Sequence, residues 1–323
     1  MATPSSTDLL KLTIADYHTE LLAKSVTIFQ SELVSQAFVA ARFIKTPSEI
    51  EMIKYASIVA SKAHARLSQD IWSYGGEIVL AAKFALYSSW CGARLQAYNP
   101  IVGCGPHAAV LHFPTGESPD LGLPEIKSDT FILVDASPEF MGYASDLTRT
   151  YSKSQTLQMK LIYAIVAEAQ KTGLNNYILG ASWGSICDSV FSNLLYGLIE
   201  IGIIRGGTFE ELQASGIVKL FMPHGVGHPV GLDVHDPIPS QYYNGSALYP
   251  YDYKLDYGMV HTIEPGIYFI PYLLDLHRMN ATSPWFNLVN WEVLEIYMHV
   301  GGVRIEDVTA IMHDGTTLIL TLL

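Results

Sequence analysis

The sequence predicts an α+β fold, in which helices and antiparallel strands are mixed. Segments with helical periodicity and one predicted hairpin occupy residues 43 to 200, and short β-rich runs set among glycines and prolines follow residue 215. The 323 residues are 49% hydrophobic and 15% charged, which is typical of a globular protein with enough apolar side chains for a large core.

The clearest predicted helix begins after Thr46. We place Thr46 as the N-cap, Pro47 as the first helical residue, and Glu49 as the partner of Thr46 in a capping box. Apolar residues then recur at steps of three or four from residue 50 to residue 67. Three further helices are predicted over residues 77–91, 156–171 and 182–200.

The predicted strands fall in two regions. "TFILVDASPEF" (130–140) is an apolar run that ends in an aspartate and a turn, and "GYASDLTRTYS" (142–152) follows it with strand-forming residues, so together they predict a hairpin. After residue 215, short antiparallel strands are predicted in "GIVKLFM", "MVHTIEPGIYFI", "GGVRIEDVTAIM" and "TTLILTLL".

Charge and cysteine content exclude several classes of protein. The formal net charge of −12 argues against nucleic-acid binding, for which a basic face would be expected. Cys91, Cys104 and Cys187 give no disulfide framework and fit a reducing compartment, so we expect a cytoplasmic protein. The N-terminus has no signal-peptide pattern, and no stretch reaches about 18 uncharged apolar residues, so we expect no membrane span.

Four carboxylates lie in or beside the apolar, strand-like runs: Asp135, Asp146, Glu264 and Glu306. Carboxylates are rarely buried without a partner, so four of them need a shared compensating charge, and a divalent metal is the simplest one. A tight hairpin would let Asp135 and Asp146 point toward one place from adjacent strands. An oxygen-rich ligand set of this size fits two divalent cations and favours Mn²⁺ or another hard ion.

The stretch "MPHGVGHPVGLDVHDP" (222–237) places His224, His228 and His235 among glycines and apolar residues. One imidazole would complete the metal site, and the others would line a substrate cleft. Each residue taken alone also has a purely structural interpretation. Asp135 would be a turn residue, Asp146 would pair with Arg149, and Glu264 would end a strand. Glu306 would pair with Arg304, and the histidines would be satisfied core residues. The joint occurrence of these residues in this order favours the metal site.

Four motifs resemble the catalytic domain of the peptidase family that includes prolidase (Xaa-Pro dipeptidase) and the Xaa-Pro aminopeptidases: "VDASPEFMGYASDLTRTY", "FMPHGVGHPVGLDVHD", "TIEPGIYFI" and "GGVRIEDV". The likeness runs from about Arg42 to about His313 and is greatest to eukaryotic-type prolidase. It implies a pita-bread fold, with two pseudo-symmetric α+β halves around a dinuclear metal centre. Residues 43–323 would form the catalytic domain, and residues 1–42 a linker or remnant of an N-terminal domain.

The resemblance also implies the metal ligands. Asp135 would chelate one metal, Asp146 and Glu306 would bridge both, and His228 and Glu264 would complete the shell of the second. Mn²⁺ is expected, with Co²⁺ or Zn²⁺ as alternatives.

The implied reaction is hydrolysis of the bond before proline by a metal-activated water. Glu264 would shuttle its proton, and His235 would polarise the scissile carbonyl. His112 and His224 would line the substrate pocket, and Arg304 would support the carboxylates.

The sequence departs from the family pattern in ways that affect specificity. Only about 42 residues precede the likeness, so we expect the family's usual N-terminal domain to be absent. No arginine occurs shortly before "EPG", where prolidases hold the substrate's carboxylate, and only Lys254 is basic there. A glycine of the first motif is replaced by Ser137. We expect Xaa-Pro dipeptides as substrates, with longer Xaa-Pro peptides, or a non-catalytic binding role, as alternatives. A homodimer is one arrangement that the resemblance allows.

Overall fold

The computed structural model describes residues 31–73, 75–115, 127–245 and 250–321. The chain divides into two compact units, Met1–Phe38 and Val39–Leu323. Helix α2 (Glu32–Phe43) contains both this division and the boundary after residue 42 that the sequence suggested. The assignment of residues 43–323 as one catalytic domain stays a prediction. Among the described residues, no helix has the length and apolar character needed to cross a bilayer.

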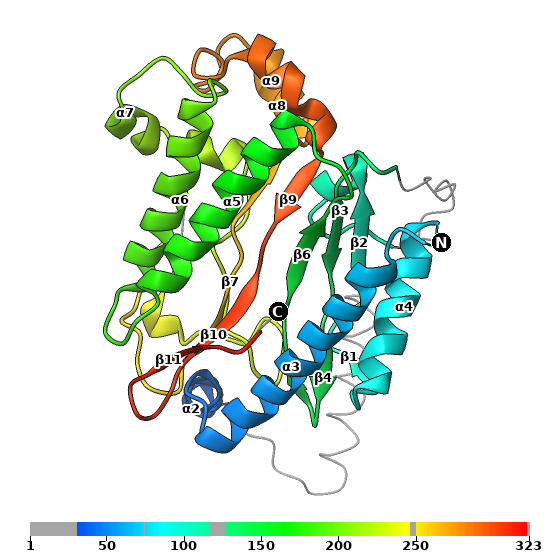
Figure 1. Ribbon diagram of the computed structural model, residues 1–323. Coiled ribbons are helices and arrows are strands. Elements are labelled where there is room, and N and C mark those ends of the chain that lie inside the picture. The colour runs from blue at the N-terminus through cyan, green and yellow to red at the C-terminus, as the bar shows by residue number, and fades with distance from the viewer. Residues whose placement is uncertain (1–30, 74, 116–126, 246–249, 322–323) are drawn as a thin grey trace, which may run out of the picture. The chain divides into compact units, whose positions relative to one another are not determined.

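The first half of the larger unit packs two helices against short antiparallel strands (Figure 1). Its helices are α3 (Pro47–Asp70) and α4 (Glu77–Trp90), with η1 (Gly105–Ala109) as a single 3₁₀ segment. One sheet has the order β1-β4-β5, with β1 at Leu95–Gln96, β4 at Pro138–Phe140 and β5 at Tyr143–Ala144. The other has the order β2-β3-β6, with β2 at Ile101–Cys104, β3 at Ile132–Asp135 and β6 at Thr148–Tyr151.

Helix α3 begins as the sequence predicted. The Thr46 hydroxyl accepts the Glu49 backbone N–H, and the Glu49 carboxylate accepts the Thr46 backbone N–H at 2.7 Å, which completes the capping box. The predicted apolar face is buried, at Ile50, Ile53, Ala56, Ala60, Ala63 and Leu67. The other three predicted helices are confirmed as α4, α5 (Leu157–Asn176) and α6 (Trp183–Glu200).

The predicted hairpin is confirmed, and it is interrupted in the middle. Strands β4 and β5 pair next to the turn, where Met141 and Gly142 have φ of 51° and 83°, as a two-residue hairpin loop requires. Strands β3 and β6 pair further along, with Asp135 opposite Thr148. Residues 136–137 and 145–147 separate the two pairings, so Asp135 ends β3 directly before the interruption and Asp146 lies within it.

The second half contains the remaining elements. Its helices are α5, α6, α7 (Phe209–Ala214), α8 (Pro271–Arg278) and α9 (Trp291–Tyr297), with 3₁₀ segments η2 (Ile217–Leu220), η3 (Ser240–Tyr242) and η4 (Met298–Val300). Its strands are β7 (Val260–Ile263), β8 (Gly266–Tyr268), β9 (Gly302–Arg304), β10 (Asp307–Ile311) and β11 (Thr317–Ile319). Strand β10 pairs with β11 and β7, and β8 pairs with β9, all antiparallel. Figure 1 shows α5 and α6 on the side of these strands away from α3 and α4.

One predicted strand is wrong. "GIVKLFM" forms the 3₁₀ segment η2, which follows Gly216 in the left-handed conformation (φ 68°). Ile217, Val218 and Leu220 are all buried. An apolar run that is buried on every side does not distinguish a strand from a helical turn, because the period that separates the two is absent.

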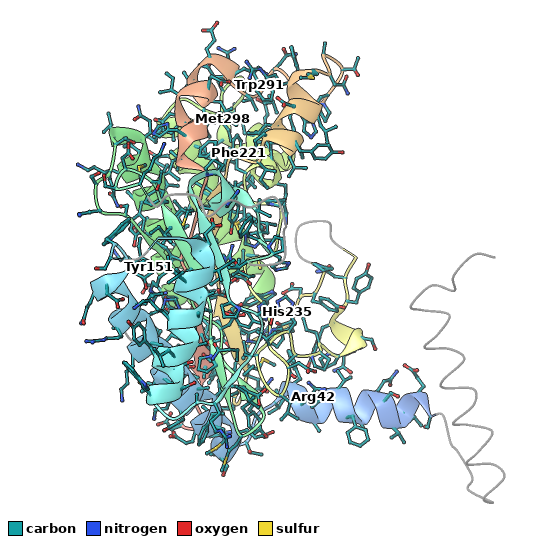
Figure 2. The ribbon with its side chains drawn as sticks, turned by 90° about the vertical axis from the view of Figure 1, so that its right-hand side faces the viewer. Arg42, Tyr151, Phe221, His235, Trp291 and Met298 are labelled. Atoms are coloured by element: carbon teal, nitrogen blue, oxygen red, sulfur yellow. The ribbon has the colours of Figure 1, made fainter. Side chains whose placement is uncertain are left out.

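The largest apolar core belongs to the second half, where Phe221 is buried and Trp291 and Met298 pack against the same cluster (Figure 2). The two halves meet where β6 lies against β9. The Glu306 backbone N–H donates to the Thr148 carbonyl at 3.1 Å, and the Thr150 hydroxyl donates to the Arg304 carbonyl at 2.8 Å. We call this junction of residues 148–150 with 304–306 the seam.

Candidate metal centre

The four predicted carboxylates all lie where strands end beside the seam. Asp135 is the last residue of β3, and Asp146 lies between β5 and β6. Glu264 follows β7 directly, and Glu306 lies between β9 and β10. Because β3, β5 and β6 belong to the first half and β7, β9 and β10 to the second, the two halves contribute two carboxylates each.

Three predicted ligands already converge on one point. Single ligand atoms of Asp146, His228 and Glu306 all lie within 4.8 Å of one another, close enough to hold one metal ion. Nε2 of His228 is 3.5 Å from Oδ2 of Asp146 and 3.5 Å from Oε1 of Glu264, so this imidazole lies between the two carboxylates. Both carboxylates therefore face the same nitrogen of His228.

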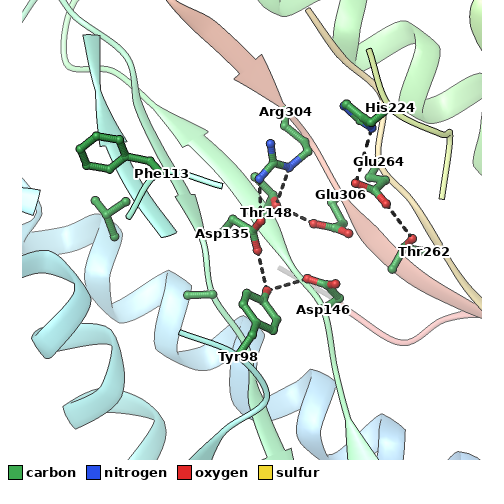
Figure 3. A network of polar contacts seen from close by, with 12 residues as sticks. Tyr98, Phe113, Asp135, Asp146, Thr148, His224, Thr262, Glu264, Arg304 and Glu306 are labelled. Carbon is green, nitrogen blue, oxygen red and sulfur yellow. Dashed lines mark hydrogen bonds and ion pairs between the residues drawn. The ribbon is translucent and has the colours of Figure 1, made fainter. Parts of the chain in front are cut away.

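Asp135 is linked to the same group through a tyrosine that the sequence analysis did not identify. The Tyr98 hydroxyl lies 2.6 Å from Oδ1 of Asp135 and 2.5 Å from Oδ1 of Asp146 (Figure 3). Arg304 donates from Nη2 to Oδ2 of Asp135 at 2.5 Å and from Nη1 to the Tyr268 hydroxyl at 3.0 Å. The network thus places Asp135 beside the ligand group and fixes its orientation.

Two threonines orient the glutamates. The Thr148 hydroxyl donates to Oε2 of Glu306 at 2.5 Å, and the Thr262 hydroxyl donates to Oε1 of Glu264 at 3.2 Å (Figure 3). Thr262 also accepts the backbone N–H of His228 at 2.9 Å. Neither threonine, nor Tyr98, carries a sequence signal of its own, because a hydroxyl next to a strand is common in any β-rich protein.

The structure settles two of the structural alternatives. Arg149 forms its ion pair with Asp307, at 2.6 Å, rather than with Asp146. Arg304 forms its ion pair with Asp135 rather than with Glu306. Asp146 and Glu306 are therefore without the simple surface partners that the structural interpretation would give them.

The cluster holds a surplus of buried negative charge. Burial raises the pKa of Asp135 and raises that of Glu306 well above the usual range, and neighbouring carboxylates add to both effects. Burial also raises the pKa of Glu264, to about 7. Arg304 supplies one positive charge and a proton on His228 supplies a second, against four carboxylates. Divalent cations therefore fit this site, because they supply the positive charge that the described residues lack.

His228 directs its Nε2 toward the carboxylates of the cluster. Its Nδ1–H donates to the Pro229 carbonyl at 3.0 Å, because a carbonyl oxygen can only accept, and this leaves the lone pair of Nε2 directed at Asp146 and Glu264. Burial alone would lower the pKa of His228, but the hydrogen bond to Asp146 and the charge of Glu264 raise it to about 9. Without a metal, Nε2 of His228 therefore carries a proton, and a bound cation would displace this proton.

A cavity of about 370 Å³ opens onto the cluster, and it is lined by all nine residues that the sequence singled out. The predicted pocket residues His112, His224 and His235 are among them. The rest of the lining is largely apolar and includes Trp183, Val226, Ile238, Pro250 and Tyr251.

The two flanking histidines are neutral. Burial lowers the pKa of His224 to about 3 and that of His235 to about 4. Nδ1–H of His224 donates to the Gly225 carbonyl at 2.8 Å, so its Nε2 accepts from the Tyr268 hydroxyl at 2.9 Å. The ring of His235 lies against that of His228, with centroids 3.7 Å apart.

The chain matches a known protein family over most of its length. Residues 51–313 match metallopeptidase family M24. A probable Xaa-Pro aminopeptidase of Paracoccidioides lutzii is 34% identical over 307 residues, which cover 89% of this chain and 59% of that protein. A probable Xaa-Pro aminopeptidase of Botryotinia fuckeliana is 33% identical over 313 residues and is covered to 55%. The chain thus spans little more than half the length of these relatives.

Solved structures give the same result for the fold. Aminopeptidase P of Escherichia coli, in a low-pH form, is 31% identical with a TM-score of 0.71, over 87% of this chain and 56% of that one. A variant of the same enzyme in complex with substrate is 29% identical with a TM-score of 0.71, over 89% of this chain and 58% of that one. Aminopeptidase PepP of Pseudomonas aeruginosa is 26% identical with a TM-score of 0.74, over 99% and 66%. These similarities confirm the predicted pita-bread fold.

Proposed function

We propose a function for this chain from the premise that it belongs to metallopeptidase family M24: it hydrolyses the peptide bond that precedes proline. The observation that carries the proposal is the buried group of four carboxylates and His228 at the end of a substrate-sized cavity. The names of the Xaa-Pro aminopeptidases to which the chain is similar support the choice of bond.

The family binds divalent metal ions, and Asp135, Asp146, His228, Glu264 and Glu306 would hold two of them here. Mn²⁺ is the ion we propose, because four of these five residues are oxygen donors. When bound, such ions lower the pKa of a water so that hydroxide is available at neutral pH. The chain's own residues supply the remaining steps.

Glu264 is the proposed proton carrier. The Thr262 hydroxyl donates to one of its oxygens at 3.2 Å, and the other oxygen lies 3.9 Å from Nδ1 of His224. It would take the proton of the attacking water and deliver it to the leaving nitrogen. This delivery is required because the nitrogen of an Xaa-Pro bond carries no hydrogen and cannot leave as an anion.

The neutral imidazole of His235 would donate a hydrogen bond to the scissile carbonyl, where negative charge develops. His112 and His224 would border the bound peptide. His224 presents no free acceptor, since both of its nitrogens are engaged, so we assign it a role in shape rather than in proton transfer.

The charges around the cavity support longer peptides rather than dipeptides as the proposed substrates. Among the described residues that line it, Arg304 is the only guanidinium or ammonium group, and it is engaged by Asp135, Tyr268 and Thr148. Lys254, the basic residue nearest before "EPG", is exposed and is not among the described residues of the lining. The free carboxylate of an Xaa-Pro dipeptide would enter a site already rich in carboxylates without a cation to receive it. We therefore propose Xaa-Pro aminopeptidase specificity in place of the dipeptidase specificity expected from the sequence.

The test compares Ala-Pro with Ala-Pro-amide, which differ only in that carboxylate, using the purified chain with Mn²⁺ and a Glu264→Gln variant as the inactive control. We expect the amide to be cleaved about tenfold faster or more, the factor that corresponds to about 1.4 kcal/mol. Faster cleavage of Ala-Pro would show a dipeptidase. Cleavage of neither by folded, metal-loaded protein would refute hydrolysis and favour a binding role.

The three cysteines Cys91, Cys104 and Cys187 are free thiols, which supports the cytoplasm as the proposed location. Whether the chain forms a homodimer stays a prediction.

A further inference from the structure

The loop that joins His228 to His235 folds around the carboxylate of Asp236. The backbone N–H of Asp236 donates to the Pro229 carbonyl at 3.0 Å, and Oδ1 of Asp236 accepts the backbone N–H of Asp233 at 3.3 Å. A Cβ at Gly231 would lie 2.5 Å from Oδ2 of Asp236, so the loop passes too close to the carboxylate for any other residue. The side chain of Asp236 is 1% exposed although it follows His235 directly.

Two cations from the segment before α3 reach this carboxylate. Nζ of Lys45 lies 3.0 Å from Oδ2 of Asp236, and the Lys45 side chain is also 1% exposed. Arg42 contacts Oδ1 of Asp236 and, at 2.5 Å, Oδ2 of Asp233. Figure 2 shows Arg42 below His235.

Lys45 is itself held firmly by its backbone. Its N–H donates to the Gly258 carbonyl at 2.8 Å, and its carbonyl accepts from Nε2 of His313 at 2.9 Å. A Cβ at Gly258 would lie 2.4 Å from the Lys45 carbonyl oxygen. The backbone from which the Lys45 ammonium group extends is therefore fixed, and the 228–236 loop is attached to this group through the buried ion pair with Asp236.

We propose that the Lys45–Asp236 ion pair is a positioning unit that sets the orientation of the His235 imidazole. Asp236 and His235 are adjacent, so a shift of the buried carboxylate moves the ring that lies against His228. Neither charged residue lines the cavity, and each therefore acts through His235 rather than on the substrate. The catalytic consequence rests on the proposed function, whereas the geometric one does not.

The geometric part is tested by NMR of the full chain with ring-labelled histidine, with the His235 signals assigned from a His235→Ala variant. We expect Lys45→Met and Asp236→Asn to shift or split the His235 ring signals and leave those of His64 in place. Lys83→Met is the matched control, because it removes the lysine of the Lys83–Asp70 ion pair far from this loop in the sequence. If Lys45→Met does not fold, Asp236→Asn, which keeps the shape of the side chain, decides alone.

The catalytic part is tested by a double-mutant cycle on hydrolysis of an Xaa-Pro peptide. Misplacing a catalytic group by about 1 Å costs on the order of a hundredfold, so we expect Asp236→Asn to lower kcat by roughly tenfold to a hundredfold with little change in KM. In the His235→Ala background the same change should have almost no further effect.

Unmoved His235 signals, or the same fold loss of kcat in both backgrounds, would overturn the positioning role. A chain without hydrolytic activity would refute the proposed function and leave the NMR result to decide the geometry.

Discussion

Replacing Glu264 with Gln should stabilise the metal-free protein while it abolishes the proposed activity. Burial raises the pKa of this carboxyl from 4.5 to about 7. Between these two pH values the folded protein binds more protons at Glu264 than the unfolded chain does, so the free energy of unfolding falls as the pH rises through this window. The loss corresponds to about 3 kcal/mol above pH 7, and Gln, which never ionises, avoids it.

His228 reduces the gain. Burial lowers the pKa of His228, but its carboxylate neighbours raise it more, and the net change is from 6.5 to about 9. This histidine therefore stabilises the fold fully below pH 6.5, and the stabilisation is lost as the pH rises to about 9. The charge of Glu264 is one cause of the raised value, so the variant loses part of this contribution. The net gain is about 1–3 kcal/mol at pH 8, or roughly 2–5 °C in Tm for a chain of this size.

The assay is thermal and urea unfolding of chelator-treated wild type and Glu264→Gln from pH 4.5 to 8.5. The gain should be small at pH 4.5 and grow toward pH 8. Glu51→Gln is the matched control, because Glu51 is exposed and its carboxylate pairs with Lys54 at the surface. A Gln variant that is less stable than wild type at pH 8, or a gain that does not change with pH, would contradict the buried charge surplus. Mn²⁺ should reverse the order, since it stabilises wild type by binding.

Three further predictions concern the surroundings of the cluster. Tyr98→Phe removes the hydroxyl that contacts both Asp135 and Asp146, so it should lower the free energy of unfolding of the metal-free protein by about 2 kcal/mol, measured by urea unfolding. An unchanged value would mean that the hydroxyl is not bonded there. Gly227→Ala places a Cβ 2.0 Å from the Thr262 carbonyl oxygen, so it should lower the free energy of unfolding by about 1–3 kcal/mol or more. It should also weaken Mn²⁺ binding measured by calorimetry, and unaltered binding would refute the close approach. Burial lowers the pKa of His64 to about 3, so the stability of the metal-free protein should fall by about 2 kcal/mol between pH 7 and 5 from this residue alone, and His64→Gln should flatten that limb of the pH profile.

The features that the sequence predicted correctly are those whose partners are close in the chain or whose residue type is distinctive. The capping box joins Thr46 and Glu49, three residues apart, and local chemistry decides it. The four carboxylates were identifiable because a carboxylate in an apolar run needs a compensating charge, whereas their role as metal ligands, with His228, stays a prediction. Their convergence required the hairpin and the seam, of which only the hairpin has a local signal.

The features that the sequence could not predict depend on contacts between distant residues. Lys45 and Asp236 are 191 residues apart, and each is unremarkable in its own segment. Tyr98 reaches Asp135 and Asp146 across 37 and 48 residues, and a tyrosine before Asn-Pro suggests only a turn. In η2, tertiary burial on all sides removed the period on which the assignment of a strand depended.

The seam has a consequence for how the protein would open. Each half supplies two of the four carboxylates, so with the proposed ligands neither half alone would hold both ions. Release of the ions and separation of β6 from β9 would then be one cooperative event. On chelation, backbone amides of β6 and β9 should lose their protection from hydrogen exchange at a common rate, whereas those of α3, held by the core of the first half, should exchange more slowly.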